Sequence, residues 1–204
     1  MNKKIALNIN NAVFSRFFGT RETKNPDALF RELETRYFNL YRTNNTGINS
    51  TGNLQFLNWE KRKNMLVMFN ESYITTMSFR DYAYTGGDFG LNMEKYLVFD
   101  IRTGRDLKLA DIFAPGFYDK IGLIITNRIK ENLKIGESES LSNYGFFADK
   151  AEPTENFYVN TAGIGFHYNT YEIAGKETGP LLVFIPFSEL TPLLISSHPF
   201  EWLR

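Results

Sequence analysis

Two segments of the 204-residue chain place apolar residues three or four positions apart, the spacing of an amphipathic helix. The first follows Asn25-Pro26-Asp27, which supplies an N-cap residue, a proline for the first helical position and an acid for the first turn. We predict a helix over residues 26–41 there. The second follows Pro115-Gly116, and its apolar stripe predicts a helix over residues 117–133.

Alternating apolar and polar residues predict strands in the first half of the chain. A strand is expected over residues 5–9, and a meander of three strands over 54–59, 65–69 and 73–82. The charged run Glu60-Lys61-Arg62-Lys63-Asn64 would form the first turn of this meander. Residues 44–53 are almost all Asn, Thr, Ser and Gly, which predicts a loop.

A buried strand and a hairpin turn are expected near the middle of the chain. Residues 96–99 are apolar on both faces, which predicts a central strand covered from both sides. The segment from Asp100 to Arg105 predicts a tight turn with Gly104 at positive φ. Leu107 and Leu109 would lie on the return strand.

The last part of the chain predicts a second hairpin and a short helix. Residues 157–159 and 164–168 flank a Thr-Ala-Gly turn, residues 181–185 form an apolar strand, and Ser188 opens a helix. No repeat and no long linker interrupts the chain. We therefore expect a single compact unit over residues 1–204. Its fold would be α+β, with two principal helices packed on a mainly antiparallel sheet.

Composition and charge exclude several classes of protein. The chain is 43% hydrophobic, which is enough for a proper core at this length and too much for a disordered protein. Its 23 Lys and Arg residues balance 23 Asp and Glu residues, so no excess positive charge is available for nucleic acid or an anionic membrane. The absence of cysteine excludes disulfides and thiolate metal sites. A folded soluble protein that binds no nucleic acid is expected.

The residues alone say little about localisation. The apolar run Ile5-Ala6-Leu7 is far shorter than a secretory leader needs, and no stretch is long enough to span a membrane. The sequence fits a cytoplasmic protein, or the mature part of an exported one whose leader has been removed.

Motifs for metal binding, nucleophilic catalysis and phosphate binding are missing from the sequence. The two histidines are 31 residues apart with no HExxH helix, so we predict no metal and no cofactor. His167 is expected to face solvent or to bond to a loop, and His198 to be exposed. There is no cysteine nucleophile and no Gly-x-Ser-x-Gly elbow. The glycines of residues 86–90 lack the spacing of a phosphate loop and favour a tight turn.

Paired carboxylates are the remaining catalytic hypothesis, because two acids at a suitable separation can hydrolyse a glycosidic bond. The candidates near predicted turns are Asp88, Asp100, Asp111 and Glu172. Structural roles compete with this one, since Asp100 can open the hairpin turn, Asp111 can cap the Ile112-Phe113 turn, and Glu172 lies in a predicted loop.

Aromatic residues supply candidates for a binding surface, because their flat faces stack on sugar rings. The chain has 19 Phe, 11 Tyr and 2 Trp, most of them at predicted core positions. Those that border predicted loops, and that we expect at the surface, are Tyr82, Tyr84, Phe89, Tyr168 and Tyr171.

One succession of short motifs over about a hundred residues resembles a known family. It consists of Tyr84-Thr85-Gly86-Gly87, Tyr96-Leu97-Val98-Phe99-Asp100, Thr103-Gly104, Leu107-Lys108-Leu109-Ala110-Asp111-Ile112-Phe113, Tyr171-Glu172-Ile173-Ala174, Gly179-Pro180 and Ile185-Pro186-Phe187-Ser188-Glu189-Leu190. These motifs resemble the RsiV family of extracellular bacterial domains. That family forms the outer part of lysozyme-sensing anti-sigma factors and accompanies peptidoglycan deacetylases of the PdaC type. Residues 1–84 are similar to the PdaC-type segment that precedes it, and residues 85–204 to the RsiV domain itself.

The resemblance implies a non-enzymatic module of the bacterial cell envelope. Such a module would be exported, to the periplasm or the outer envelope, and its partners would be lysozyme-like muramidases or peptidoglycan. The loops at residues 86–91 and 169–179 are the first places to expect binding, and the candidate residues are Tyr84, Asp88, Phe89, Tyr168, Tyr171 and Glu172. Family members often carry Ala-His-Gly after the paired glycines, where this chain has Asp88-Phe89-Gly90. Two alternatives stay open: a carbohydrate hydrolase that uses paired carboxylates, and a structural lipoprotein domain without a ligand.

Overall fold

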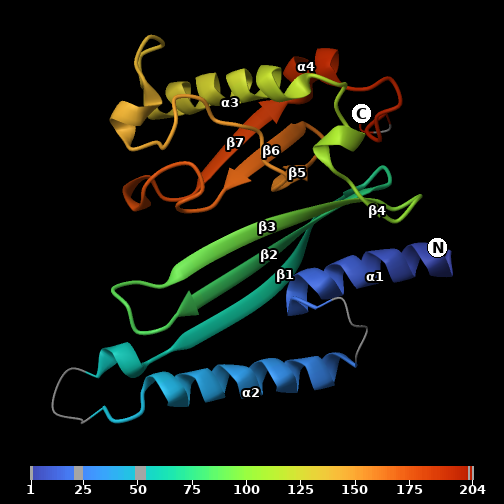
Figure 1. The fold of residues 1–204 in the computed structure, drawn as a ribbon. Helices are drawn as coiled ribbons and strands as arrows, with labels where there is room; N and C mark the ends of the chain where they lie inside the picture. The colour runs from blue at the N-terminus through green and yellow to red at the C-terminus, as the bar shows by residue number, and fades with distance from the viewer. Residues whose placement is uncertain (1, 21–24, 49–53, 202, 204) are drawn as a thin grey trace.

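The computed structural model describes residues 2–20, 25–48, 54–201 and 203, and its elements are stacked in four layers (Figure 1). Helices α1 (Lys3–Phe18) and α2 (Pro26–Asn44) form one outer layer, and α3 (Phe117–Leu133) forms the other. Two antiparallel sheets lie between them, with strand orders β1-β2-β3-β4 and β5-β6-β7. The predicted α+β fold with mainly antiparallel sheet is confirmed.

Seven described strands build the two sheets. The strands are β1 (Glu60–Glu71), β2 (Ile74–Tyr84), β3 (Leu91–Asp100), β4 (Arg105–Asp106), β5 (Phe157–Val159), β6 (Gly163–Tyr168) and β7 (Leu181–Pro186). A short helix α4 (Phe187–Leu190) follows β7, and single 3₁₀ turns occur at Gln55–Leu57, Leu109–Asp111, Leu141–Tyr144, Lys176–Thr178 and Thr191–Leu193.

The strand predicted over residues 5–9 is wrong, because these residues belong to α1. Asn2 caps this helix by accepting a hydrogen bond from the backbone N–H of Lys4 at 3.0 Å. Ile5 and Ile9 are four residues apart, a spacing that fits a helix and an alternating strand equally well. Leu7 distinguishes the two structures, because in a strand it would share one face with Ile5 and Ile9. It is instead 55% exposed, as a residue on the outer side of a helix would be.

The two predicted helices are confirmed. Asn25 accepts a hydrogen bond from the N–H of Asp27 at the start of α2, which continues three residues beyond the predicted end. The apolar stripe of α3 packs into the core through Ile121, Ile125 and Ile129. The predicted loop over residues 44–53 lies partly outside the described residues, and its described part, 45–48, leaves α2 in a turn.

The charged run at residues 60–64 is the first half of β1 and does not form a turn, which corrects the prediction. Lys63 lies opposite Asp81 of β2, and their side chains form an ion pair at 2.9 Å. Opposite charges placed across two strands stabilise their pairing, so a run that suggested a turn is compatible with a strand. Residues 54–59 do not form the predicted strand either, because Gln55–Leu57 is a 3₁₀ turn.

The predicted central strand is confirmed as β3, which pairs with β2 along its length. The turn after it also follows the prediction, with Gly104 at φ 73°. A side chain at this position would meet the backbone of Ile5 at about 3 Å, so the glycine also lets α1 approach the turn. The return strand is shorter than predicted, since only Arg105 and Asp106 pair with β3 and Leu109 starts a 3₁₀ turn.

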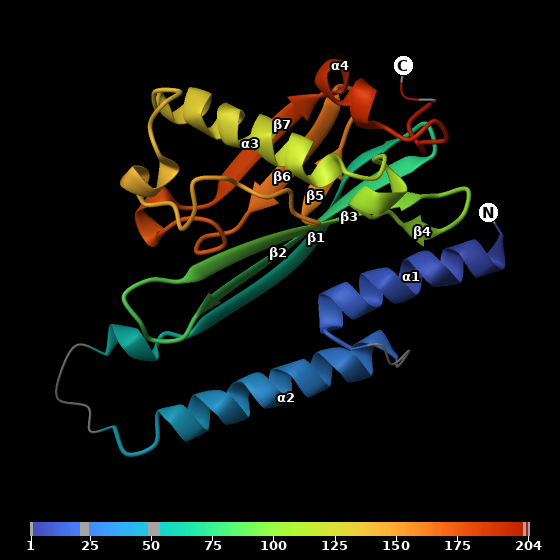
Figure 2. The ribbon, with the colours of Figure 1, turned by 45° about the horizontal axis from the view of Figure 1, so that its top comes forward.

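The four-stranded sheet separates two hydrophobic layers. Val98 on β3 belongs to the main core, which lies under α3 and includes the buried residues of β5, β6 and β7. Phe79 and Phe99 are also buried but lie outside that core, and the alternation along β2 and β3 puts them on the face opposite Ile74 and Val98. The buried Leu29 of α2 also lies outside the core, and Figure 2 shows α1 and α2 on the side of the four-stranded sheet away from α3. The hairpin β5–β6, the apolar strand β7 and the short helix α4 all form where the sequence predicts them. No described helix is long and apolar enough to cross a membrane.

Candidate functional site

Two asparagine side chains take the place of a neighbouring strand beside β3. Within the part of the chain that the structure describes, this strand pairs with β4 only at Phe99 and Asp100, so no described strand lies beside the backbone of residues 94–96 on that side. Unpaired backbone groups next to a core are costly and must be bound by other polar groups. Asn156 and Asn169 bind them here, and both asparagines are buried.

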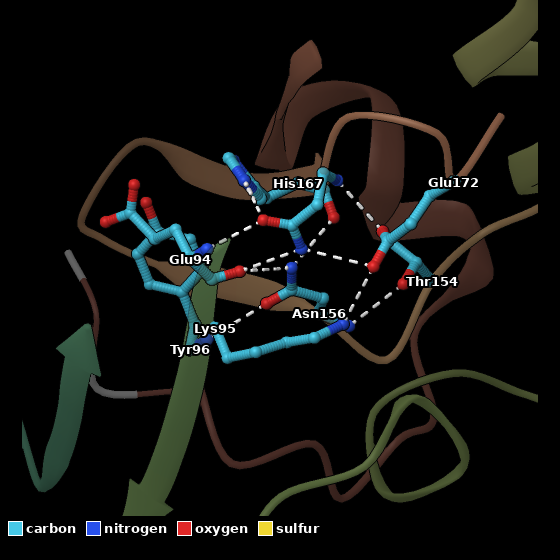
Figure 3. Close-up of polar contacts among 8 residues, drawn as sticks. Glu94, Lys95, Tyr96, Thr154, Asn156, His167 and Glu172 are labelled. Atoms are coloured by element: carbon cyan, nitrogen blue, oxygen red, sulfur yellow. Dashed lines mark hydrogen bonds and ion pairs between the residues drawn. The ribbon is translucent and has the colours of Figure 1, made fainter. Parts of the chain in front are cut away.

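Each of the two amides bonds to the β3 backbone through both its oxygen and its nitrogen (Figure 3). The Oδ1 atom of Asn156 accepts from the N–H of Tyr96 at 2.9 Å, and its Nδ2 atom donates to the carbonyl of Glu94 at 2.9 Å. Asn169 accepts from the N–H of Glu94 at 2.6 Å and donates to the same carbonyl at 3.1 Å. Asn156 also donates to the carbonyl of His167 at 3.0 Å. The three-stranded sheet is thereby fixed to the edge of β3.

His167 lies in this polar cluster and is almost fully buried. Its Nε2 atom is 3.3 Å from Oδ1 of Asn169, at the start of the β6–β7 loop. Of the two predicted environments for His167, the solvent-facing one is wrong and the loop-bonded one is confirmed. Burial lowers the pKa of His167, and the nearby Glu94 carboxylate only partly offsets this effect. The imidazole is therefore neutral at pH 7.

Glu172 is the one predicted site residue that takes part in the cluster. Its carboxylate accepts hydrogen bonds from the N–H and the side-chain amide of Asn169, and forms an ion pair with Lys95 at 3.1 Å. Burial alone would raise the pKa of Glu172, but these hydrogen bonds outweigh it and lower the pKa. Glu172 is thus held as a carboxylate between the β6–β7 loop and β3.

A groove opens next to the cluster, between the two sheets. It consists of two adjoining depressions of about 460 and 260 Å³ that share Arg80, Glu94, His167 and Pro180. We call it the inter-sheet groove. Its larger part is also lined by Met68, Phe69, Tyr96, Tyr158, Val159, Asn160, Leu181 and Leu182, and its smaller part by Asn92, Met93 and Asn169.

The inter-sheet groove combines aromatic rings with an ion pair. The rings of Tyr96 and Tyr158 lie 5.4 Å apart, and those of Tyr96 and His167 lie 5.8 Å apart. Arg80 and Glu94 form an ion pair at 2.9 Å, in which the arginine is the more exposed partner. Burial is the main cause that raises the pKa of Tyr96, and the nearby Glu94 raises it further. The hydroxyl of Tyr96 therefore keeps its proton. Rings that can stack, beside polar groups of both charge signs, suit a ligand with flat apolar faces and hydroxyl groups.

The two loops expected to bind a partner meet at one end of the groove. Phe89 lies in the β2–β3 loop and Lys176 in the β6–β7 loop, and the lysine ammonium is 3.4 Å from the centre of the phenylalanine ring. Asn92 follows the first loop, and Asn169 and Pro180 begin and end the second, so both loops border the smaller depression. The structure therefore brings together two segments that are about eighty residues apart in sequence.

The predicted aromatic candidates differ in their exposure. Phe89 and Tyr171 are exposed, and Asp88 is exposed beside Phe89. Tyr82 and Tyr84 are half-buried near the end of β2. The expectation that Tyr168 lies at the surface is wrong. It is buried in the core, and its hydroxyl donates to the carbonyl of Glu152 at 2.6 Å. Its position at the end of a strand made it look like a loop residue, although that strand is covered on both faces.

Two of the other predicted carboxylates, Asp100 and Asp111, have structural partners. Asp100 accepts from the N–H and guanidinium of Arg102 in the hairpin turn, which confirms its predicted role there. Asp111 accepts from the backbone N–H of Lys108 and pairs with Arg105, and so caps the 3₁₀ turn before Ile112. His198 is only partly exposed, and its Nδ1 atom accepts from the N–H of Phe200 at 3.2 Å.

Sequence reasoning missed the groove, including Arg80, Glu94 and Asn169, and also missed Asn156 in the polar cluster beside it. Arg80 and Glu94 are polar residues in strands, which is ordinary for a half-exposed sheet. Asn156 and Asn169 precede and follow the second hairpin, where asparagine commonly marks a turn. Only the topology shows that they bond to a strand that lies 60 and 75 residues earlier in the chain.

Stability should fall on mild acidification because of His167. Its pKa is lowered on folding, so the unfolded chain takes up the proton at a higher pH than the folded chain does. The contribution of the neutral imidazole is complete above the unfolded pKa of about 6.5 and is lost progressively as the pH falls below that value toward the lower pKa of the folded state. We expect the urea midpoint to drop between about pH 7.5 and about pH 5.5, which lies above the range where most carboxylates titrate.

Two variants separate this effect from general acid sensitivity. His167→Gln should show a smaller drop in the urea midpoint than the unmodified protein. His198→Gln, which changes the second histidine of the chain, should keep the full drop. An equal drop in all three proteins would show that His167 does not cause it.

Comparison with known proteins finds a family model that matches part of the chain. Residues 110–188 match the family model of DUF3298, a protein family of unknown function. A solved DUF3298 member from Bacteroides fragilis is 25% identical to this chain, with a TM-score of 0.86 over 100% of this chain and 83% of that one. A DUF3298 family protein from Pseudomonas aeruginosa PAO1 is 17% identical, with a TM-score of 0.56 over 85% of this chain and 82% of that one, and it supports the fold alone.

The matched region contains much of the inter-sheet groove, including Tyr158, His167 and Asn169. It also overlaps the motifs that resemble the RsiV family, although the narrower RsiV assignment stays a prediction. No curated protein matches the sequence. Residues 110–188 thus match the DUF3298 family model, and the chain as a whole is similar in fold to a solved protein described as a member of that family.

Proposed function

We propose that the protein is a non-enzymatic binding module of the bacterial cell envelope, exported to the periplasm or the outer envelope. Its partner would be a lysozyme-like muramidase or peptidoglycan, as the resemblance to the RsiV family implies. The observation that carries the proposal is the contact between Phe89 and Lys176, which joins both candidate loops at the end of the inter-sheet groove.

The exposed aromatic residues support recognition at this end of the molecule. Phe89 and Tyr171 are large, exposed and carried by the two joined loops. Aromatic residues at the centre of an interface commonly provide most of its binding energy. The groove behind the loops adds Tyr96, Tyr158 and the Arg80–Glu94 ion pair, which can stack on and hydrogen-bond to a sugar.

The environments of the carboxylates favour binding over hydrolysis. A catalytic acid needs a raised pKa so that it holds a proton at neutral pH. Glu172 has a lowered pKa, Asp100 is paired with Arg102, and Asp111 is paired with Arg105. These acids are used as structural carboxylates, and the proposal assigns no catalytic residue.

Calorimetric titration with c-type lysozyme, and in parallel with soluble muropeptides, tests the proposed partners. Saturable binding at micromolar affinity or tighter, about 8 kcal/mol or more, would support the proposal. The absence of heat with both would remove both partners and leave the fold and family unaffected.

Removing either exposed loop aromatic should weaken binding without unfolding the protein. We expect Phe89→Ala and Tyr171→Ala each to reduce affinity at least about tenfold, since truncation of a central aromatic costs about 2 kcal/mol. Tyr118→Ala is the matched control, because Tyr118 is similarly exposed but lies on α3. Unchanged affinity in both loop variants, with circular dichroism unchanged, would show that the loops are not the binding surface.

A further inference from the structure

Arg80 lines both depressions of the inter-sheet groove, and most of its hydrogen-bond donors are unused. Its Nε atom donates to Oε1 of Glu94 at 2.9 Å, whereas its two Nη nitrogens bond to no residue that the structure describes. The side chain of Arg80 is 52% exposed and that of Glu94 is 18% exposed. A ligand that enters the groove therefore meets the guanidinium before it meets the carboxylate.

Glu94 holds the guanidinium in one orientation. The two residues lie opposite each other in the pairing of β2 with β3, so their side chains are on the same face of the sheet. Because Glu94 occupies only the Nε atom, the edge of Arg80 that carries both Nη nitrogens stays open. That edge is planar and matches the two oxygens of a carboxylate.

The charge of the groove favours a carboxylate over a phosphate or a cation. Among the described residues that line the groove, Arg80 and Glu94 are the charged ones, and His167 is held neutral by burial. A single guanidinium that already neutralises one carboxylate suits a ligand with one negative charge better than a phosphate with almost two. A cation would be repelled by Arg80, the more exposed partner of the pair.

Aromatic rings lie next to this charged group. Tyr96 follows Glu94 by two residues, so it lies on the same face of β3. Its ring is 5.4 Å from that of Tyr158, which crosses β6 at Gly165, where a Cβ atom would collide with the ring. The larger depression, of about 460 Å³, is within the size range of sites for small molecules. Flat rings beside a guanidinium suit a sugar ring that carries an acid.

We propose that the inter-sheet groove binds a sugar that carries a carboxylate. The sugar ring lies against Tyr96 and Tyr158, the carboxylate accepts hydrogen bonds from both Nη nitrogens of Arg80, and Glu94 is a positioning residue. The inference deepens the proposed function, and it rests on that function in taking peptidoglycan as the source of the ligand. Peptidoglycan offers this chemistry from two sources, the lactyl group of N-acetylmuramic acid and the stem peptide attached to it.

NMR titration of the ¹⁵N-labelled protein with three probes tests the need for a carboxylate. N-acetylmuramic acid carries the lactyl carboxylate, muramyl dipeptide carries a carboxylate on its peptide, and N-acetylglucosamine has the same type of ring with neither. At least one of the two acids should bind about tenfold more tightly than N-acetylglucosamine, because charge-assisted hydrogen bonds are stronger than neutral ones. The acid that binds more tightly identifies the source. Equal affinity for all three probes would overturn the inference.

Three variants separate the contribution of the charge from that of the rings. Arg80→Gln should weaken binding of the preferred acid about tenfold and leave the affinity for N-acetylglucosamine unchanged. Tyr158→Leu should weaken all three probes by a similar factor, because it removes a ring and no charge. Arg105→Gln is the control, since Arg105 is an exposed, ion-paired arginine on β4, and this variant should bind like the unmodified protein. A preference for the acid that survives in Arg80→Gln would contradict the assignment.

The same variant distinguishes this inference from the proposed function. If Arg80→Gln binds soluble muropeptides as tightly as the unmodified protein does, the groove assignment is wrong and the proposed function stands. If the unmodified protein binds neither lysozyme nor larger muropeptides but prefers N-acetylmuramic acid through Arg80, the proposed partners fall and the groove assignment is supported.

Discussion

Replacing Asn156 by alanine should lower the free energy of unfolding by at least about 3 kcal/mol. The substitution removes one buried amide that bonds to the N–H of Tyr96 and to the carbonyls of Glu94 and His167. Each buried backbone group left without a partner costs about 1–3 kcal/mol. Because the same amide fixes the three-stranded sheet to β3, the loss should also loosen the inter-sheet groove.

Urea denaturation followed by circular dichroism measures this effect. Asn143→Ala is the matched control, because Asn143 is exposed and its side chain bonds to no described residue. The control should change the free energy of unfolding by less than about 0.5 kcal/mol. If Asn156→Ala is equally mild, water replaces the amide and the two sheets do not depend on it.

Gly163→Ala should destabilise the protein by about 3 kcal/mol, the upper end of the range for overpacking. Gly163 lies opposite Pro186 at the start of β6. A Cβ atom added there would be 2.2 Å from the carbonyl oxygen of Ile185 and 2.8 Å from the Cα of Pro186. These are backbone atoms of the paired strand, so the clash can be relieved only by separating β6 from β7.

Gly87→Ala is the control for the general effect of adding a methyl group to a glycine. A Cβ atom at Gly87 meets nothing within 4 Å, and the residue lies in the exposed β2–β3 loop. The melting temperature of the Gly87→Ala variant should be unchanged or slightly raised, because alanine restricts the conformations of the unfolded chain. A similar fall in melting temperature for both variants would contradict the close packing of β6 on β7.

The sequence predicts elements well where local chemistry determines them. Asn25 and Pro26 start α2, Gly104 turns β3 toward β4, and the isoleucines of α3 form its buried face. It fails where a short segment fits two periods, as at Ile5 and Ile9, or where charges pair across strands, as at Lys63 and Asp81. In both cases the structure depends on contacts with residues distant in sequence.

The candidate site depends still more on distant contacts. Loop position correctly indicated that Phe89 and Tyr171 are exposed, but it misplaced Tyr168, whose strand is covered on both faces. The groove lies between two sheets that come from different parts of the chain, so its lining has no local pattern. Asn156 and Asn169 look like turn residues until the unpaired edge of β3 is known.

The contact between Phe89 and Lys176 has a consequence for the thermodynamics of binding. Free loops lose conformational entropy when a partner fixes them, and each immobilised side chain with many rotamers costs about 0.5–1.5 kcal/mol of affinity. Here the two loops already restrain each other through the ring and the ammonium group. Part of that entropy is therefore lost when the protein folds, so the proposed partner would meet two loops that already restrain each other.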